Sequence, residues 1–223
     1  MRTINIKNIY HIYKQHVLSV LLLLSFCDFV GAKKGELAEQ AVQQQQELVE
    51  KYGLVDNQWW LDQCHHLIEQ MQLSKFSKCL IIDAEFANAY SLAHGVLILT
   101  KGLLLNINNN DQLAYIMAHE HAHLSLEHHQ QAMQMVKNPP TFFTKSRLKK
   151  FYRKMEQQAD EAADEMLTAN HKDAKQIHHY LIRIDRSMKE SSSDHKKLNQ
   201  RIQRYNLPQE LIDDQWQSMQ NNE

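Results

Sequence analysis

Apolar and polar residues follow one another along most of the chain with the three- and four-residue spacing of helices. In residues 36–72 this spacing is interrupted around residues 53–57, which predicts two helices. Short aliphatic runs at residues 79–83 and 96–100, separated by small and turn-forming residues, predict a small antiparallel sheet. Since only 5 Gly and 3 Pro punctuate the chain, helices should dominate, and the pattern predicts a mostly helical α+β fold.

The second half of the chain carries two longer helical patterns. Residues 108–111 offer caps for a helix that should continue to about Val136, shortly before two consecutive prolines that cannot extend it. Another helix is predicted for residues 146–169, and residues 174–205 continue the pattern with one polar interruption. The buried stripe of the helix at 146–169 is expected to comprise Leu148, Tyr152, Met155, Ala159, Ala162 and Met166.

Composition limits the kind of protein. With 223 residues, 43% of them apolar, the chain is long enough for one core and should form a single domain. Lys and Arg residues are scattered among slightly more numerous acids, and the formal charge is -1. Because no basic patch is expected, nucleic acid is not expected as a partner.

Residues 1–32 have the pattern of a secretory signal peptide. Three basic residues precede an apolar run at 17–26, and a Val-Gly-Ala sequence suited to signal peptidase follows. The run is too short to cross a membrane, which takes about 20 apolar residues. Acylation of Cys27 is less favoured because the bulky Phe26 precedes it. We therefore expect residues 33–223 to be exported to the periplasm or beyond, with a lipid-anchored or membrane-retained form as the weaker alternative.

Export would leave Cys64 and Cys79 in the mature chain. An oxidising compartment permits a disulfide between them, which would contribute about 3 kcal/mol by closing a loop of about 15 residues. Two buried thiols are the alternative. Neither cysteine has a neighbour at metal-binding spacing, so a thiolate zinc site is not expected.

Residues 114–129, AYIMAHEHAHLSLEHH, place five histidines and two glutamates on a predicted helix. His119, Glu120 and His123 spell H-E-x-x-H, in which the two imidazoles lie one turn apart on one face and can bind the same zinc ion. Glu120 is rotated by about 100 degrees from His119. Its carboxylate can therefore stand beside the metal and accept a proton from the attacking water. A histidine-rich, metal-buffering surface without catalysis is the alternative.

A catalytic zinc requires a third protein ligand, and the next predicted helix supplies EQQAD at residues 156–160. Glu156 and Asp160 are four residues apart. One carboxylate can therefore bind zinc while the other accepts a hydrogen bond from the back of a ligand imidazole. By itself this stretch is typical of a charged helical face, but its position one helix after H-E-x-x-H favours the ligand interpretation.

Three segments occur in a familiar order: NAYSLAHGVLILTKGLL at 88–104, LAYIMAHEHAHLSLEHH at 113–129, and then EQQAD. Together they resemble the zinc metallopeptidase family of HtpX, BepA and the CAAX prenyl proteases, metallopeptidase family forty-eight. The resemblance extends from about residue 45 to about residue 205 and implies a gluzincin-type fold, with the small sheet packed on the active-site helices.

The resemblance also implies the roles of the main site residues. His119, His123 and Glu156 would bind one zinc ion per chain, and Glu120 would be the general base. The multiple hydrophobic spans of membrane-embedded relatives and the helical repeats of others are not recognisable in this sequence, so it resembles a minimal, exported form.

Other histidines receive weaker expectations from the same resemblance. His128 corresponds to a further family histidine and is expected to be structural, although Glu127 replaces the arginine usual before it. His121 and His129 are expected to be merely solvated. The family commonly has two glycines before its active-site strand, and this chain has His94 at the first of them, where the imidazole could reach the cleft.

His195 and Arg201 correspond to a family histidine and arginine that follow the third-ligand helix, although Lys196 replaces the proline. Arg201 could stabilise the oxyanion on the scissile carbonyl, and His195 could occupy the fourth zinc position at rest. The alternatives are a helix-start residue for His195 and an ordinary ion pair for Arg201.

These features predict a zinc metalloendopeptidase that cleaves unfolded or misassembled envelope proteins. Strand 96–100 is expected to be an edge that pairs with extended polypeptide, and peripheral association with the envelope is compatible with this activity. Residues 139–143 are expected either to cover the cleft or to plug the core. The alternative function is a zinc-containing chaperone or adaptor that binds extended segments with little or no proteolysis.

Overall fold

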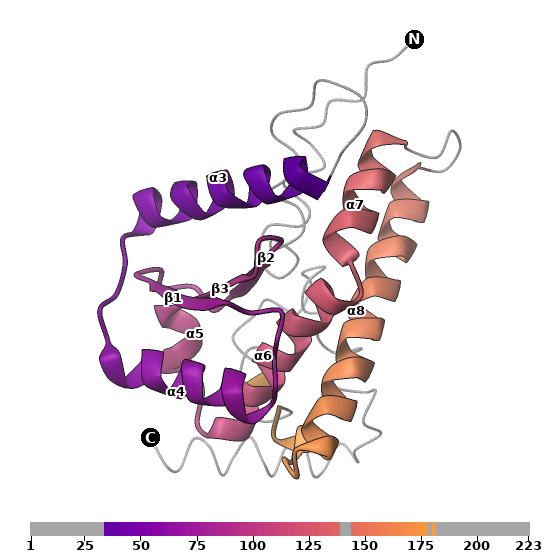
Figure 1. Cartoon of the computed structure of the whole chain (residues 1–223). Coiled ribbons are helices and arrows are strands. Elements are labelled where there is room, and N and C mark those ends of the chain that lie inside the picture. The colour runs from indigo at the N-terminus through magenta and orange to yellow at the C-terminus, as the bar shows by residue number, and fades with distance from the viewer. Residues whose placement is uncertain (1–33, 139–143, 178–179, 182–223) are drawn as a thin grey trace, which may run out of the picture.

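The computed structural model describes residues 34–138, 144–177 and 180–181 (Figure 1). Its helices are α3 (Lys34–Tyr52), α4 (Gln58–Gln70), α5 (Lys101–Leu105), α6 (Asn110–Ser125), α7 (His128–Lys137), α8 (Thr144–Ala169) and the short 3-10 helix η2 (Ala174–Gln176); its strands are β1 (Lys78–Ile82), β2 (Ala89–Leu92) and β3 (Val96–Thr100). These elements confirm the mostly helical α+β class. The signal peptide predicted for residues 1–32 and the helical pattern predicted beyond residue 181 lie outside the described residues.

Polar caps determine where two of the helices begin. The Asn57 side chain accepts a hydrogen bond from the Trp60 amide at the start of α4, and the Asn109 side chain does the same for the Gln112 amide at the start of α6. Each cap satisfies an amide that has no partner within its helix. No helix in the described part of the chain is both long and apolar enough to span a membrane.

The three strands form a mixed sheet in the order β1-β3-β2, so the expectation of a purely antiparallel sheet was wrong. The two predicted strands, β1 and β3, pair in parallel, with Leu80 opposite Ile98, while the unpredicted strand β2 pairs antiparallel with β3. All five β3 residues are buried, which suits a central strand covered on both faces. Strand β3 is therefore not the edge that the sequence analysis expected.

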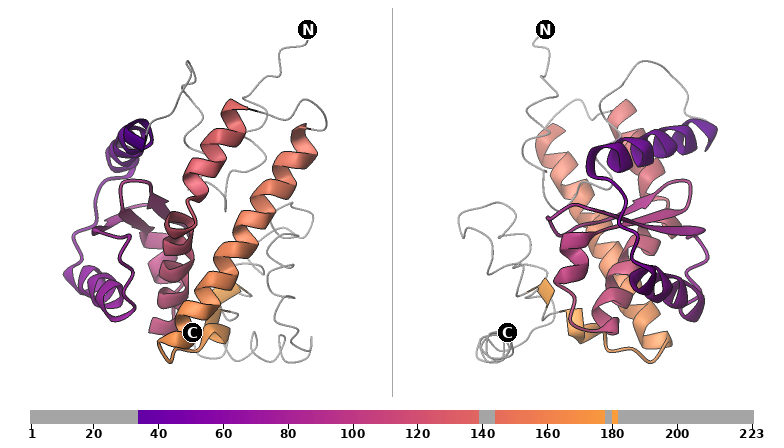
Figure 2. Two further views of the ribbon diagram at one scale, coloured as in Figure 1. Left: turned by 45° about the vertical axis from the view of Figure 1, so that its right-hand side comes forward. Right: turned by 90° about the vertical axis from the view of Figure 1, so that its left-hand side faces the viewer.

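Two apolar cores lie on opposite faces of this sheet, and different helices cover its two sides (Figure 2). One face packs on α3, and the other packs on α4, α5 and α6, with α8 beyond α6. Alternate residues of β3 point to opposite sides: Ile98 belongs to the α3 core, and Leu97 and Leu99 belong to the larger core. A disulfide between Cys64 on α4 and Cys79 on β1 ties α4 to the sheet, so the paired alternative for these cysteines holds.

The single helix expected to start at residues 108–111 and to reach about Val136 is divided into α6 and α7. Glu127 has φ 54°, a left-handed conformation that interrupts the helical hydrogen-bond ladder between Ser125 and His128. In an uninterrupted helix, residues five apart would point about 140 degrees away from each other. The break instead brings the ring of His128 back to that of His123, with 5.0 Å between their centroids.

Helix α8 lies along α6 (Figures 1 and 2) and carries the carboxylates of EQQAD. Its predicted buried stripe is confirmed at Tyr152, Met155 and Ala159. Toward the end of the helix the buried positions are Ala163 and Leu167, whereas Leu148, Ala162 and Met166 are only half-buried. The stripe therefore moves by one residue, because buried positions spaced by four residues drift around a helix that has 3.6 residues per turn.

Candidate metal centre

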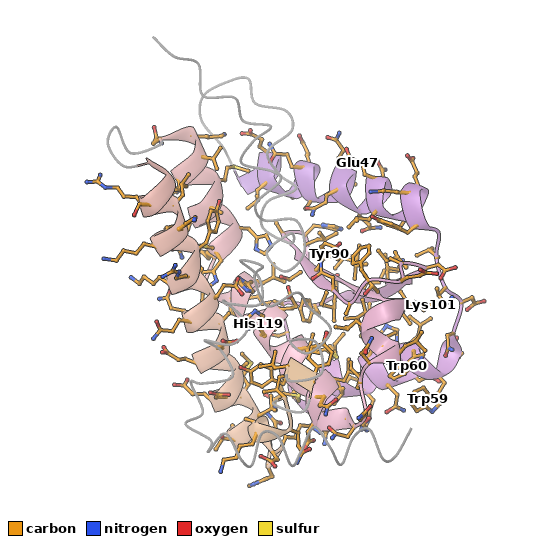
Figure 3. The ribbon with its side chains drawn as sticks, turned by 180° about the vertical axis from the view of Figure 1, so that it is seen from behind. Glu47, Trp59, Trp60, Tyr90, Lys101 and His119 are labelled. Atoms are coloured by element: carbon orange, nitrogen blue, oxygen red, sulfur yellow. A yellow bond between two sulfur atoms is a disulfide. The ribbon has the colours of Figure 1, made fainter. Side chains whose placement is uncertain are left out.

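His119 and His123 lie one turn apart on α6, and Glu156 faces them from α8. The Nε2 atoms of the two imidazoles are 3.1 Å apart, and the Glu156 carboxylate oxygens lie 3.6 Å from Nε2 of His119 and 3.5 Å from Nε2 of His123. All three ligand atoms lie within 4.8 Å of one another. Figure 3 shows His119 between α8 and the strands, at the centre of the molecule.

This donor set fits a zinc ion. Two ligands held about 2.0 to 2.1 Å from a tetrahedral zinc ion lie about 3.3 Å apart, close to the three separations between these atoms. Two imidazoles and one carboxylate are also the ligand types that zinc prefers, and three protein ligands leave one position open for substrate or water. Among the described residues, these three form the group whose ligand atoms lie close enough together to hold a metal ion.

The Nδ1 atoms on the far side of both imidazoles also have partners. Nδ1 of His119 lies 2.9 Å from Oδ1 of Asp160, and the Tyr115 hydroxyl donates to the same oxygen at 3.2 Å. Nδ1 of His123 lies 3.0 Å from Nδ1 of His128. Such partners fix the orientation of an imidazole and keep its Nε2 atom directed at the metal position.

Burial keeps the His123 imidazole neutral, as a metal ligand requires. Removal from water lowers the pKa of His123 well below its ordinary value of 6.5, although the Glu156 carboxylate acts in the opposite direction. Burial likewise lowers the pKa of His128. A neutral His128 can accept at Nδ1 the proton that His123 donates from its own Nδ1, which leaves Nε2 of His123 free for the metal.

Glu120 is not one of the three converging ligands; its carboxylate lies near His119 and Glu156 and reaches strand β2. Its Oε2 accepts hydrogen bonds from the Ser91 amide at 3.0 Å and from the Ser91 hydroxyl at 2.7 Å. Burial raises the pKa of Glu120, while His119 and the hydrogen bonds from Ser91 oppose the rise. A carboxylate with a raised pKa, next to a metal centre and not part of it, is suited to accept a proton and return it.

Three other histidines differ from expectation. His121 and His129 are buried and not merely solvated, and burial lowers the pKa of each to about 4. His121 accepts a hydrogen bond from the Lys75 amide at Nε2 and packs edge-on against Phe76, so it joins α6 to the loop before β1. His94 faces α3, where its Nε2 lies 2.8 Å from Oε1 of Gln45, and it does not join the metal ligands.

Gly95, the second of the two positions at which the family commonly has glycine, adopts a conformation that requires glycine. Gly95 has φ 88°, and a Cβ atom there would lie 2.7 Å from the main-chain oxygen of Lys75. Only glycine fits this turn without displacing backbone. The substitution at position 94 therefore leaves the turn before β3 intact.

Two residues of the site, Ser91 and Tyr115, were not predicted from the sequence. Ser91 lies within the quoted segment 88–104, and its polar side chain in an otherwise apolar run is the signal that could have identified it. Tyr115 lies four residues before His119 and so on the same helical face, which is a weaker signal. His195, Arg201 and residues 139–143 lie outside the described residues, so their roles stay predictions.

Comparison with known proteins finds one family model that matches the central segment of the chain. The family model described as "Peptidase family M48" matches residues 55–148. That segment contains β1, β2, β3 and the H-E-x-x-H motif of α6, and it ends before Glu156. No curated protein sequence matches the chain.

Proposed function

Because residues 55–148 belong to peptidase family M48, whose members use zinc, we propose that this chain is a zinc metalloendopeptidase of the gluzincin type. The observation that carries the proposal is the convergence of His119, His123 and Glu156 with the carboxylate of Glu120 beside them. We further propose one zinc ion per chain, held by those three ligands.

In the proposed reaction each residue of the site has a distinct task. A bound zinc ion would supply Lewis acidity, which polarises the scissile carbonyl and makes water a stronger acid. Glu120 accepts the proton of the attacking water and delivers it to the leaving amine. Asp160 and His128 hold the two ligand imidazoles from behind, at 2.9 Å and 3.0 Å.

Strand β2 is the part of the sheet suited to bind an extended substrate. It is at an end of the strand order, and α6, which carries Glu120, packs against it. An extended chain that pairs with a strand edge gains affinity from main-chain hydrogen bonds, with little dependence on its sequence. This supports unfolded or misassembled polypeptides as the substrate class, and the signal-like residues 1–32 support proteins of the cell envelope as their source.

The test is digestion of casein, an unfolded protein substrate, by the zinc-loaded chain and by Glu120→Gln. We expect Glu120→Gln to abolish cleavage and to retain one zinc per chain, because the amide cannot act as a base while the three ligands remain. Glu165→Gln is the matched control: it removes an exposed carboxylate elsewhere on α8 and should leave both cleavage and zinc content unchanged.

Three other outcomes would contradict the proposal or part of it. Casein that is bound but not cut by the zinc-loaded wild-type chain would favour the chaperone or adaptor function. Several weakly held metal ions per chain would favour a metal-buffering surface. Loss of zinc from Glu120→Gln would show that Glu120 is itself a ligand.

A further inference from the structure

The main-chain groups of Ser91 lie on the outer edge of strand β2, where α6 packs against the strand. The Thr100 amide donates to the Asn88 carbonyl, and Tyr90 lies opposite Ile98 two residues along. In an antiparallel ladder, residues whose main-chain groups face the partner strand alternate with residues whose groups face away. Those of Asn88 and Tyr90 face β3, so the amide and carbonyl of Ser91 point away from the sheet.

That outward amide is bound to the proposed general base. Oε2 of Glu120 accepts from the Ser91 amide at 3.0 Å and from the Ser91 hydroxyl at 2.7 Å. Ser91 is fully buried, and Glu120 is 7% exposed. Hydrogen bonds from two donors of one residue to a buried carboxylate oxygen restrict where that carboxylate can lie.

An extended polypeptide pairing with β2 needs the same amide. Main-chain pairing with a strand edge uses the outward N–H groups as donors to the carbonyl oxygens of the added chain. At Ser91 the N–H group that would pair with the added chain already donates to Glu120. The Ser91 hydroxyl is a second donor to Glu120, and the polypeptide does not require it. The two donors of Ser91 can therefore serve different partners at the same time.

We propose that Ser91 is a positioning residue that couples substrate pairing on β2 to the placement of Glu120. Its amide passes from Glu120 to a substrate carbonyl when a polypeptide pairs with the edge, and its hydroxyl keeps the carboxylate beside the metal centre. The inference rests on the proposed function for its catalytic consequence, but the hydrogen bonds that motivate it do not depend on a metal ion.

The hydroxyl is tested with Ser91→Ala, which removes one oxygen atom, and with Ser91→Thr, which retains the hydroxyl. We expect Ser91→Ala to lower kcat for casein-derived peptides about 10-fold or more, with KM within about 2-fold of wild type and zinc content unchanged. Ser91→Thr should recover most of kcat. Ser77→Ala is the matched control, because Ser77 directly precedes β1, the opposite edge strand, and its hydroxyl donates to the Gly95 carbonyl, so its loss should not affect turnover.

A wild-type kcat in Ser91→Ala would contradict the role proposed for the hydroxyl. An equal loss of kcat in Ser91→Ala and Ser91→Thr, with both variants folded and zinc-loaded, would contradict it as well. Absence of cleavage by the wild-type chain would instead contradict the proposed function. The two failures are thus distinguishable.

The amide is tested by binding, without any cleavage. Glu120→Gln and Glu120→Ala both lack the base, but the glutamine oxygen can still accept from the Ser91 amide and the alanine cannot. We expect a fluorescently labelled casein peptide to bind Glu120→Ala several-fold more tightly than Glu120→Gln, as measured by anisotropy. Binding to Glu120→Ala that is equal to or weaker than binding to Glu120→Gln would contradict the proposal that the Ser91 amide passes from Glu120 to the substrate. Glu165→Ala and Glu165→Gln should not differ from each other.

Discussion

Asp160 offers the sharpest test of how the chain supports its metal centre. Its Oδ1 lies 2.9 Å from Nδ1 of His119 and accepts from the Tyr115 hydroxyl at 3.2 Å, and the residue is only 3% exposed. We expect Asp160→Ala to weaken zinc binding without removing any of the three proposed ligands. The His119 imidazole would lose the group that fixes its tautomer and its orientation.

The structure supports a loss of about 10- to 100-fold in zinc affinity. A buried hydrogen bond to a charged group contributes about 1.5 to 3 kcal/mol. At about 1.4 kcal/mol per factor of ten, that range corresponds to roughly one to two orders of magnitude in affinity. The 2.9 Å contact between His119 and Asp160 gains this strength in the zinc-loaded protein, because an imidazole whose Nε2 binds a cation carries its proton on Nδ1 and donates it more strongly.

Two further variants separate charge from hydrogen bonding. Asp160→Asn keeps an acceptor oxygen and loses the charge, so a smaller loss of about 5- to 10-fold is expected from the difference between charged and neutral hydrogen bonds. Tyr115→Phe removes one neutral donor to Asp160 and should cost only a few-fold.

Affinity is measured by competition with a chromophoric chelator at neutral pH, with circular dichroism to establish that each variant is folded. Wild-type affinity in a folded Asp160→Ala protein would refute the reasoning and return Asp160 to the role of an ordinary helix residue. A loss in Asp160→Asn as large as in Asp160→Ala would show that the charge, and not the acceptor, matters.

Two more predictions concern stability. Replacing both Cys64 and Cys79 by Ala should lower the free energy of unfolding by about 3 kcal/mol, because the disulfide closes a loop of 15 residues in the unfolded chain. Urea unfolding measures this free energy. A change below about 1 kcal/mol would show that loop closure contributes less than the chain-entropy model predicts. The metal-free chain should lose stability as pH falls from about 6.5 toward about 4, because the buried His121 and His129, whose pKa is about 4, stay neutral while the unfolded chain takes up protons. The slope should approach about 1.4 kcal/mol per pH unit for each group, and a flat profile over that window would show that these imidazoles are not held neutral by burial.

The sequence by itself determined the features that depend on local geometry. Apolar spacing, with its interruption around residues 53–57, located α3, α4 and α8 to within a few residues, because a helix repeats every 3.6 residues whatever surrounds it. The same period placed His119 and His123 on one face of α6, and the spacing of Glu156 and Asp160 placed both carboxylates on one face of α8.

Tertiary structure decided which of those faces meet. The spacing of residues 79–83 and 96–100 does not determine that β2 pairs with the edge of β3 opposite β1. Strand order depends on contacts between segments that are distant in sequence. That order made β2 the edge strand in place of β3. It also put the polar Ser91 beside Glu120, 29 residues further along the chain.

Burial of the histidines was decided in the same way. Their clustering in residues 114–129 is compatible with a solvated helix face as well as with a packed one, because local spacing carries no information on what covers a helix. The left-handed residue Glu127 ended α6 and turned His128 toward His123, while packing against the loop before β1 enclosed His121. The sequence therefore specified the proposed metal ligands, and the packing of α6 against β2, α7 and α8 specified the partners that hold them.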